Sequence, residues 1–303
     1  MTIAVTGATG FVGRALLEEA ARQGAEIRAL TRRPQAKAPG VEWVPGDLHD
    51  RKALVKLVRK AETVIHVAGV VNTPDPMGFH LGNVEGTLKL VEIAVATGVP
   101  RIVFVSSLAA REPQLSKYGH SKLHAEKLVA ASGLDWTIVR PPAIYGPRDR
   151  EILELFKLAR WGVVPMPPPG RTSLIHVADL ARLLLALAPS SEAVARHKFE
   201  PDDGREDGWS HRELARAIGW AVGRRSPWVP HLSKPLLAGL ARADRALRGR
   251  KARLTPDRVG YMTHPNWVCS AKAKPPKRLW KPEVPTLEGL KATAEWYRAN
   301  KWL

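Results

Sequence analysis

A tyrosine and a lysine four residues apart offer acid–base chemistry near the middle of the 303-residue chain. Tyr118 and Lys122 begin a helical stretch that continues to Ala131, so both side chains are expected on one face of a helix. A phenol with an ordinary pKa near ~10 is a poor acid–base catalyst at neutral pH, and an adjacent ammonium favours its phenolate. Ser107 follows an apolar run, where its hydroxyl could hydrogen-bond an oxygen on which negative charge develops. These residue types predict a site for proton transfer to or from oxygen.

Short apolar runs alternate with helical stretches over the first 140 residues and would position these groups. The runs are rich in β-branched residues and lie at 3–6, 26–30, 41–45, 63–67, 102–106 and 136–140. Strands of this length separated by helices indicate βαβ units and a parallel sheet covered on both faces. Because such crossovers are right-handed, the expected fold is α/β, a doubly wound parallel sheet of the Rossmann type.

The first apolar run leads directly into a glycine-rich turn at residues 7–13, and a helical stretch follows at 14–23. Glycines at three-residue intervals let the backbone turn tightly and approach a diphosphate without Cβ clashes, while the helix N-terminus supplies N–H groups and a partial positive charge. A strand, a glycine turn and a helix in this order indicate a dinucleotide site. The loop residues expected to bind it are Gly7, Thr9, Gly10, Phe11, Val12 and Gly13.

Prolines become frequent after residue 140, which favours loops over regular elements. Seven of the ten tryptophans lie beyond residue 200, so the later part of the chain differs in character from the first. We therefore expect a dinucleotide-binding core at 1–145 and a smaller, irregular substrate-binding region at 146–303. Residues 174–190 are expected to return to the core.

The Gly-x-x-Gly-x-x-Gly spacing of the turn resembles the extended branch of the short-chain dehydrogenase/reductase superfamily, also described as the NAD-dependent epimerase/dehydratase family. That branch includes sugar-nucleotide epimerases, 3β-hydroxysteroid dehydrogenases and dihydroflavonol reductases. Residues 140–147, Arg-Pro-Pro-Ala-Ile-Tyr-Gly-Pro, are similar to a segment that follows the sixth strand in the branch. The resemblance implies that Ser107, rather than Ser106, joins Tyr118 and Lys122 in a catalytic triad. It also implies that Asn83 is an active-site asparagine.

The same resemblance implies further contacts to a nicotinamide dinucleotide. Lys122 would hold the nicotinamide ribose beside Tyr118, and Asp47 and Leu48 would frame the adenine. The remaining residues that would line the dinucleotide are Val67, Ala68 and Gly69 at the sheet edge, with Pro141 and Ile144 beside the nicotinamide.

The end of the second apolar run bears on which dinucleotide binds. An acid near this position accepts hydrogen bonds from the adenosine ribose in sites that bind NAD. No acid occurs between Ile27 and Val41, whereas Arg32 and Arg33 do, and a guanidinium suits the 2′-phosphate of NADP. The sequence therefore favours NADP, with NAD as the alternative.

Two further features have structural rather than catalytic interpretations. His66 ends the fourth apolar run, where a satisfied core histidine is favoured over an acid–base catalyst. Tyr297 and Lys301 repeat the spacing of Tyr118 and Lys122, but no strand or serine pair precedes them, so we expect them on a helix surface. No metal site is predicted.

These features favour an NADP-dependent oxidoreductase that interconverts a ketone or aldehyde and an alcohol by hydride transfer. One alternative is an NDP-sugar epimerase with tightly bound NAD, although the gap between Ser107 and Tyr118 is short compared with such epimerases. A second alternative is a non-catalytic cofactor-sensing or assembly protein. The partner is expected to be a small carbonyl, alcohol or sugar-nucleotide substrate, and the chain a monomer or homodimer.

The net charge of +18 is concentrated in one segment, since residues 224–281 hold fifteen Lys or Arg residues and two acids. A solvated surface, an anionic ligand and an acidic membrane remain as explanations, while no motif supports nucleic-acid binding. Apolar residues at helical spacing within 235–249 are expected to pack onto the protein, with peripheral membrane contact less favoured. No apolar run is long enough to span a bilayer and no secretory signal is evident. With Cys269 as its one cysteine, the chain is expected to be cytoplasmic.

Overall fold

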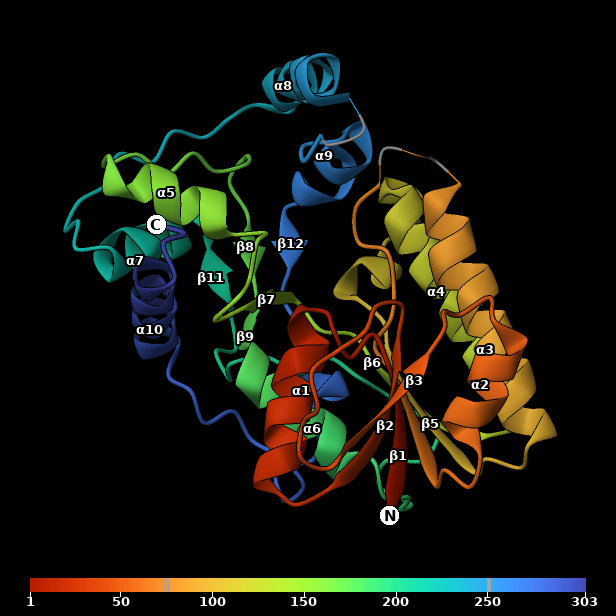
Figure 1. Cartoon of the computed structure of the whole chain (residues 1–303). Coiled ribbons are helices and arrows are strands. Elements are labelled where there is room, and N and C mark those ends of the chain that lie inside the picture. Colours follow the sequence, from red (N-terminus) through yellow and green to blue (C-terminus); the bar gives the residue numbers. More distant parts are fainter. Residues whose placement is uncertain (74, 76, 250–251) are drawn as a thin grey trace. The chain divides into compact units, whose positions relative to one another are not determined.

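The computed structural model describes residues 1–73, 75, 77–249 and 252–303 (Figure 1). The chain forms two compact units. The first comprises 1–140, 180–199 and 275–280, and the second comprises 141–179, 200–274 and 281–303. The division thus falls at residue 140, and 174–179 lie in the second unit although the sequence analysis assigned 174–190 to the core.

The first unit contains a seven-stranded sheet in which every pairing is parallel. Its strand order is β10-β6-β5-β4-β1-β2-β3, so the expected doubly wound fold is confirmed. Six strands match the predicted runs, while β10 adds a seventh of three residues whose first two are exposed. The strands are β1 (Thr2–Thr6), β2 (Glu26–Thr31), β3 (Val41–Pro45), β4 (Thr63–His66), β5 (Arg101–Val105), β6 (Asp135–Val139) and β10 (His197–Phe199).

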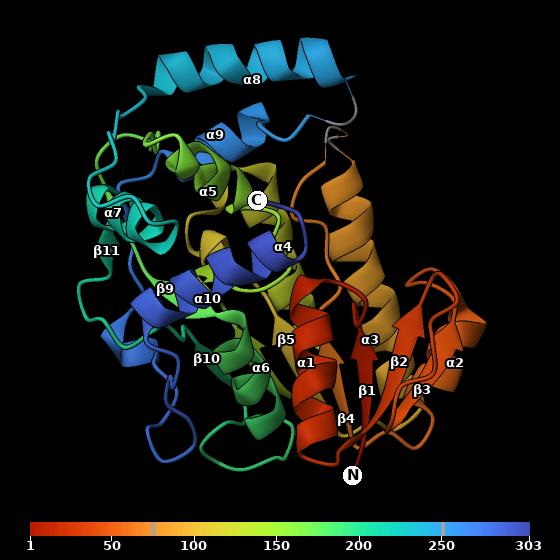
Figure 2. The same ribbon diagram turned by 60° about the vertical axis from the view of Figure 1, so that its left-hand side comes forward.

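Helices cover both faces of this sheet, as Figures 1 and 2 show. One face carries α1 (Phe11–Arg22) and α6 (Val177–Ala186), and the other carries α2 (Arg51–Val58), α3 (Gly86–Ala96) and α4 (Lys117–Ala130). The second face buries aliphatic side chains that alternate along the strands and recur at helical spacing. They include Leu54, Leu57, Leu90, Ile102 and Ile138, all fully buried.

The second unit combines two small sheets with helices around its own apolar core. β8 (Arg171–Thr172) lies between β11 (Trp209–Ser210) and β12 (Asn266–Trp267), and β7 (Ala143–Tyr145) pairs with β9 (Leu174–His176). Its helices are α5 (Leu153–Arg160), α7 (His211–Ala221), α8 (Lys234–Arg248), α9 (Pro256–Met262) and α10 (Thr286–Ala299). Among the described residues, no helix of either unit combines the length and apolar composition of a membrane span.

Tyr297 shows where the sequence analysis was wrong about this second unit. Its side chain is fully buried in the core, and its hydroxyl donates to the Asp149 carbonyl oxygen at 2.7 Å. Lys301, four residues later, is exposed beyond the end of α10. The apolar ring gains from burial and the hydroxyl finds a backbone acceptor, which explains why a tyrosine occupies this core position.

Arg101 is a buried cation that joins β5, β6 and the end of α6 within the first unit. Its guanidinium donates to the Asp135 carboxylate at 2.5 Å and to the Thr137 hydroxyl at 2.7 Å. It also donates twice to the Leu187 carbonyl oxygen, at 3.0 and 2.9 Å. With 2% of Arg101 exposed, its positive charge depends on these acceptors.

We predict that Arg101→Leu lowers the free energy of unfolding by about 3–5 kcal/mol, because it leaves buried acceptors without a donor. Urea unfolding followed by circular dichroism measures the effect. The control is Lys157→Leu, whose side chain is 43% exposed and pairs with Glu154, itself 48% exposed, and for which we expect a loss of at most about 1 kcal/mol. Equal losses in the two variants would contradict the prediction.

Candidate functional site

The glycine turn lies where the strand order of the first sheet reverses, between β1 and β4. Gly7 has a φ of +73°, and a Cβ there would lie 2.5 Å from the Ala68 nitrogen in the turn after β4. A Cβ at Gly13 would collide with the Gly7 carbonyl oxygen. Gly10 is the N-cap of α1, and no side chain caps the first turn of this helix. The arrangement fits a diphosphate, which needs close backbone approach and donors.

The other expected cofactor residues of the first unit follow its strands at the same edge. Arg32 and Arg33 are exposed just after β2, and Asp47 is exposed after β3, where its carboxylate accepts from the His49 N–H at 2.8 Å. Leu48 packs against Gly86, since a Cβ on that glycine would lie 2.8 Å from it. Carboxyl ends of parallel strands at a reversal of strand order are the usual place for a dinucleotide.

The remaining loop and edge residues divide between the two units. In the first unit, the exposed members are Thr9, Gly10 and Gly69, and the half-buried members are Phe11, Val12, Val67 and Ala68. Pro141 and Ile144 belong to the second unit, where Ile144 of β7 pairs with Ile175 of β9.

Tyr118 lies in the first turn of α4, and two neighbours fix the start of that helix. The Ser116 hydroxyl accepts from the Gly119 N–H at 2.9 Å, which caps the helix. A Cβ on Gly119 would lie 2.5 Å from the Ala109 carbonyl oxygen, so glycine allows α4 to approach the 3₁₀ turn Leu108–Arg111 after β5. The Tyr118 ring is buried and lies 5.9 Å from the Phe79 ring.

Lys122 lies one turn later on α4 with its amine buried at the end of β5. Its Nζ donates to the Val105 carbonyl oxygen at 2.7 Å and lies 4.5 Å from the centre of the Phe104 ring. Burial lowers the pKa of Lys122 to about 8, and the Glu126 carboxylate opposes part of that shift. A Cβ on Gly69 would lie 3.5 Å from Nζ, so the amine borders the turn after β4.

The two serines after β5 have different environments. Ser106 is buried and donates to Glu126 Oε1 at 2.5 Å. Ser107 is half-buried, and its hydroxyl oxygen accepts from the Ala109 N–H at 3.2 Å. Among the described residues, no acceptor takes the Ser107 proton, which leaves that proton available to a ligand. The choice of Ser107 over Ser106 as the catalytic serine stays a prediction.

Asn83 sits in a π-helical turn, His80–Glu85, that precedes α3. Its amide nitrogen donates to the Val70 carbonyl oxygen and to the Ser121 hydroxyl, both at 2.9 Å, and its oxygen accepts from the Val70 N–H at 2.7 Å. Ser121 in turn donates to the Tyr118 carbonyl oxygen at 2.8 Å. Both amide hydrogens of Asn83 are therefore used to connect the turn after β4 with the first turn of α4.

His66 is a fully satisfied core histidine, as expected from the sequence. Burial lowers its pKa to about 3, so the ring is neutral. Thr87 donates to the Asn83 carbonyl oxygen at 2.6 Å and so accepts from Nε2 at 2.9 Å, which leaves Nδ1 to accept from Thr6 at 2.6 Å. The Thr6 hydroxyl also accepts from the Ala68 N–H at 3.3 Å. The resulting chain joins β1, β4 and the turn that carries Asn83.

Glu126 is a supporting residue that the sequence analysis missed. This fully buried carboxylate accepts from Ser106 and, through both oxygens, from the Arg140 guanidinium at 2.8 and 2.6 Å. A signal was available, because Glu126 follows Lys122 by four residues and Tyr118 by eight, and so shares their face of α4.

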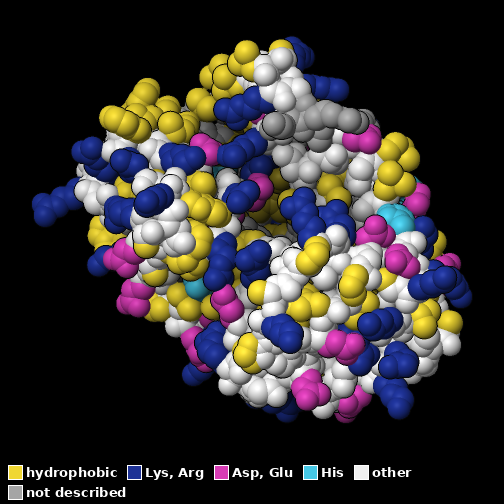
Figure 3. Space-filling view, in the orientation of Figure 1, with side chains coloured by type: hydrophobic (Ala, Val, Ile, Leu, Met, Phe, Trp, Pro, Cys, Tyr) yellow, Lys and Arg dark blue, Asp and Glu magenta, His cyan; other side chains and the backbone are white. Residues whose placement is uncertain are grey.

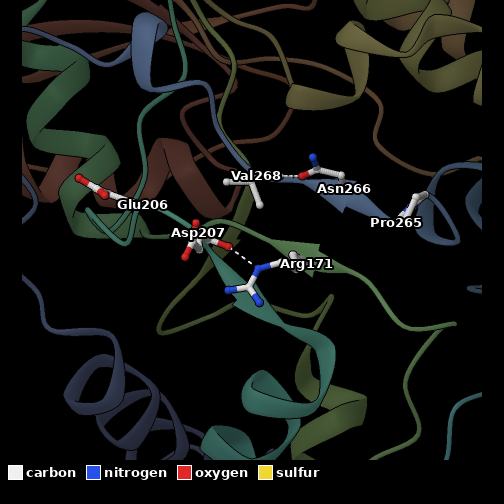
Figure 4. A pocket seen from close by; sticks show the side chains of 6 residues that line it. All are labelled: Arg171, Glu206, Asp207, Pro265, Asn266 and Val268. Atoms are coloured by element: carbon white, nitrogen blue, oxygen red, sulfur yellow. Dashed lines mark hydrogen bonds between the residues drawn. The ribbon is translucent and has the colours of Figure 1, made fainter.

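The second unit contains a separate open pocket of about 320 Å³, shown in Figure 4. Arg171 lines it, but the guanidinium points toward the backbone of the 206–208 loop and donates to the Asp207 and Gly208 carbonyl oxygens at 2.6 and 3.2 Å. The Arg171 donors are thus engaged in holding β8 to that loop. In the part of the chain that the structure describes, no group of three or more His, Cys, Asp or Glu residues is arranged to hold a metal ion.

Comparisons with known proteins identify the family of this chain. Residues 3–199 match the family model described as the NAD dependent epimerase/dehydratase family. The chain is 38% identical over 314 residues to a ceramide reductase of Caulobacter vibrioides, across 99% of this chain and 96% of that protein. It is 30% identical over 256 residues to a 2-alkyl-3-oxoalkanoate reductase of Stenotrophomonas maltophilia, across 74% of this chain and 76% of that protein.

Among solved structures, MoeE5 in complex with UDP-glucuronic acid and NAD matches 99% of both chains with a TM-score of 0.74. At 23% identity this likeness supports the fold alone. The family model covers about two thirds of the chain, and the reductase relative covers nearly all of it. The resemblance drawn from the glycine turn is therefore confirmed, and this chain belongs to the NAD-dependent epimerase/dehydratase family of NAD(P)-dependent enzymes.

Proposed function

We propose that this protein is an NADPH-dependent reductase that converts the carbonyl group of a long-chain, ceramide-like lipid to an alcohol. The observation that carries the proposal is the position of Lys122, whose amine is held at the end of β5 beside the Ser106–Ser107 pair and one helical turn after Tyr118. The similarity to a ceramide reductase over nearly the whole chain supports both the reaction class and the lipid. The 2-alkyl-3-oxoalkanoate reductase supports a ketone on an alkyl chain.

Residues of the first unit fit the cofactor. The glycine turn and the start of α1 would hold the diphosphate, and Arg32 and Arg33 would bind the 2′-phosphate of NADPH. Val67, Ala68 and Gly69 would line the dinucleotide, with Asp47 and Leu48 at the adenine. The bound nicotinamide would supply the hydride that reduces the carbonyl carbon.

Three side chains would act on the substrate oxygen. Tyr118 would donate its phenolic proton to the oxygen as the carbonyl is reduced, and the Ser107 hydroxyl would stabilise the developing charge by a hydrogen bond. The charged form of Lys122 would favour the phenolate that remains on Tyr118 and would hold the ribose. Asn83, whose amide hydrogens are both engaged, is a positioning residue in this scheme rather than a catalytic one.

An epimerase with tightly bound NAD is the main competing function. It would return the hydride to its substrate and show no net consumption of nicotinamide. The connection from Ser107 to Tyr118 is short and filled by the 3₁₀ turns Leu108–Arg111 and Pro113–Leu115, which argues against a longer epimerase-type loop. A non-catalytic cofactor-sensing or assembly role is disfavoured because Tyr118 and Lys122 are both retained.

Replacement of Tyr118 tests the reductase directly. We expect Tyr118→Phe to lower kcat for NADPH-dependent carbonyl reduction by about 10²–10⁴-fold, because the proton donor is lost. Steady-state rates of NADPH oxidation measure this, and fluorescence titration checks that cofactor binding persists. The matched control is Tyr297→Phe, which removes one hydrogen bond to Asp149 and should leave kcat within about threefold. A folded Tyr118→Phe variant that turns over at the parent rate would falsify the mechanism.

Replacement of the arginine pair after β2 tests whether the protein prefers NADPH to NADH. The double variant Arg32→Ala/Arg33→Ala should raise the Kd for NADPH by about 10–100-fold, because charge-assisted hydrogen bonds to the 2′-phosphate are lost. The Kd for NADH, which lacks that phosphate, should change by less than about threefold. Arg59→Ala/Lys60→Ala, an exposed basic pair at the far end of α2, serves as the control. An equal rise in the Kd for NADPH and in the Kd for NADH would contradict the preference for NADP.

The lowered pKa of Lys122 predicts a pH dependence. A lysine is charged below its pKa, so kcat/KM for reduction should be highest below about pH 8 and fall as pH rises through that value. Initial rates from about pH 6 to about pH 10 test this. Lys122→Met should be slow at every pH and lack the inflection. If the variant kept the same inflection, the titrating group would not be Lys122.

A further inference from the structure

Helix α8 of the second unit has two apolar faces, and only one of them is packed. Leu237 and Ala241 are buried and belong to a small cluster with Val259 of α9. Leu236, Leu240 and Leu247, in contrast, are 50%, 44% and 86% exposed. At about 100° per residue these three leucines lie within about 40° of one another, beside the packed face. We name them the leucine stripe.

Two exposed tryptophans lie near the segment that leads to this helix: Trp228 belongs to that segment, and Trp161 precedes the residues that pair with it. Trp161 is 80% exposed and Trp228 is 68% exposed. Trp228 belongs to an extended segment that pairs with residues 162–164, through its N–H to the Gly162 carbonyl oxygen at 2.7 Å and its own carbonyl oxygen to the Val164 N–H at 2.8 Å. That segment ends at Ser233, which caps α8. Figure 3 shows hydrophobic side chains above α5 and along α8, with Lys and Arg side chains beside them.

Exposed arginines accompany both groups. Arg160, Arg224 and Arg225 flank the tryptophans, and Arg224 donates to the Arg160 carbonyl oxygen at 2.9 Å. On α8 the exposed arginines are Arg242, Arg245 and Arg248, which lie about 100–160° around the helix from the centre of the leucine stripe. Asp244 is the one acid of this helix, and it already binds Arg248 at 3.3 Å and the Arg253 N–H at 2.8 Å. The surface is therefore cationic as well as apolar. Arg250 and Lys251 of the basic segment lie outside the described residues.

We propose that the leucine stripe, Trp161 and Trp228 dock onto a membrane whose lipids carry anionic headgroups. The leucine stripe would place its aliphatic side chains in the acyl boundary of the bilayer. The cationic side chains beside the tryptophans and on the other sides of α8 would attract the protein to the anionic headgroups. Indole rings favour the same boundary because they are apolar with one polar N–H. This inference rests on the proposed function, since a ceramide-like substrate would be held in a bilayer.

The charge pattern argues against the other occupants of this surface. A second copy of the chain packed symmetrically over the tryptophans would bring Arg160, Arg224 and Arg225 against the same residues of its partner. A nucleic acid would use the cations but would gain nothing from three exposed leucines. An anionic bilayer complements both features, because it offers negative charge at its surface and an apolar layer beneath.

Co-sedimentation of the full chain with lipid vesicles tests the proposal. We expect at least about tenfold tighter binding to vesicles of phosphatidylcholine with phosphatidylglycerol than to phosphatidylcholine alone, because the cationic side chains of this segment are attracted to anionic headgroups. Binding should weaken as salt is raised. No preference for the anionic vesicles would overturn the proposal.

Two variants separate the apolar and cationic contributions. Leu240→Asp/Leu247→Asp should weaken binding to the anionic vesicles by at least about tenfold, since two inserted side chains become charged. Arg160→Gln/Arg225→Gln, which changes two exposed arginines beside the tryptophans, should weaken it and reduce its salt dependence. The matched control is Leu88→Asp/Val95→Asp on α3, which changes two exposed apolar residues of the first unit, 38% and 48% exposed, and should bind vesicles as the parent does. Circular dichroism verifies that every variant folds.

The outcomes distinguish docking from the reductase function. Leu240→Asp/Leu247→Asp should keep the parent rate on a short, water-soluble ketone while losing vesicle binding. Vesicle binding without any reductase activity would support docking and refute only the proposed function. Three results would overturn docking: reductase activity without vesicle binding, a dimer lost in the leucine variant without vesicle binding, and binding of duplex DNA in place of vesicles.

Discussion

The burial of one ammonium group at the end of β5 constrains the arrangement of the candidate site. Lys122 has 4% of its surface exposed, and a charge in that position must be compensated by nearby groups. The Val105 carbonyl oxygen, the face of Phe104 and the Glu126 carboxylate supply that compensation. Because Val105 is the last residue of β5, the contact fixes α4 against the carboxyl end of the strand and carries Tyr118 with it. The lowered pKa of Lys122 reflects the energetic cost of burying its charged form.

One continuous chain of hydrogen bonds between uncharged groups links the elements next to that amine. The neutral His66 ring joins Thr6 at the end of β1 to Thr87, whose hydroxyl reaches the Asn83 carbonyl oxygen. Asn83 then binds Val70 and Ser121 through its amide. The end of β1, which leads into the glycine turn, is thereby connected to the first turn of α4. The polar groups along this connection are hydrogen-bonded to one another, and satisfied buried networks of this kind specify one arrangement. These residues can affect the orientation of a bound ligand without contacting it, because they position the elements that would contact it.

The second unit uses the same residue types for different purposes. Tyr297 repeats the tyrosine–lysine spacing, yet its hydroxyl serves a core carbonyl. Cys269 is buried, and burial raises its pKa to about 12, so it is an inert thiol rather than a nucleophile. The exposed leucines and tryptophans of this unit have no such internal role. These side chains face solvent, and the proposed docking of this surface on a membrane would bring the protein to the lipid that the proposed reaction requires.

The sequence by itself determined the six main strands, the glycine turn and the placement of Tyr118 and Lys122 on one helix face, because these depend on local spacing and on apolar periodicity. It could not determine β10, whose three residues show no apolar run, or the burial of Tyr297. Nor could it identify the partners of His66 and Glu126, since Thr6 lies sixty residues from His66 and Ser106 lies twenty from Glu126. Such contacts arise only when β1 pairs with β4, whose register places Thr6 beside His66, and when α4 packs against the end of β5. Local pattern therefore specified the elements and the candidate reacting groups, while packing between distant elements decided how those groups are held.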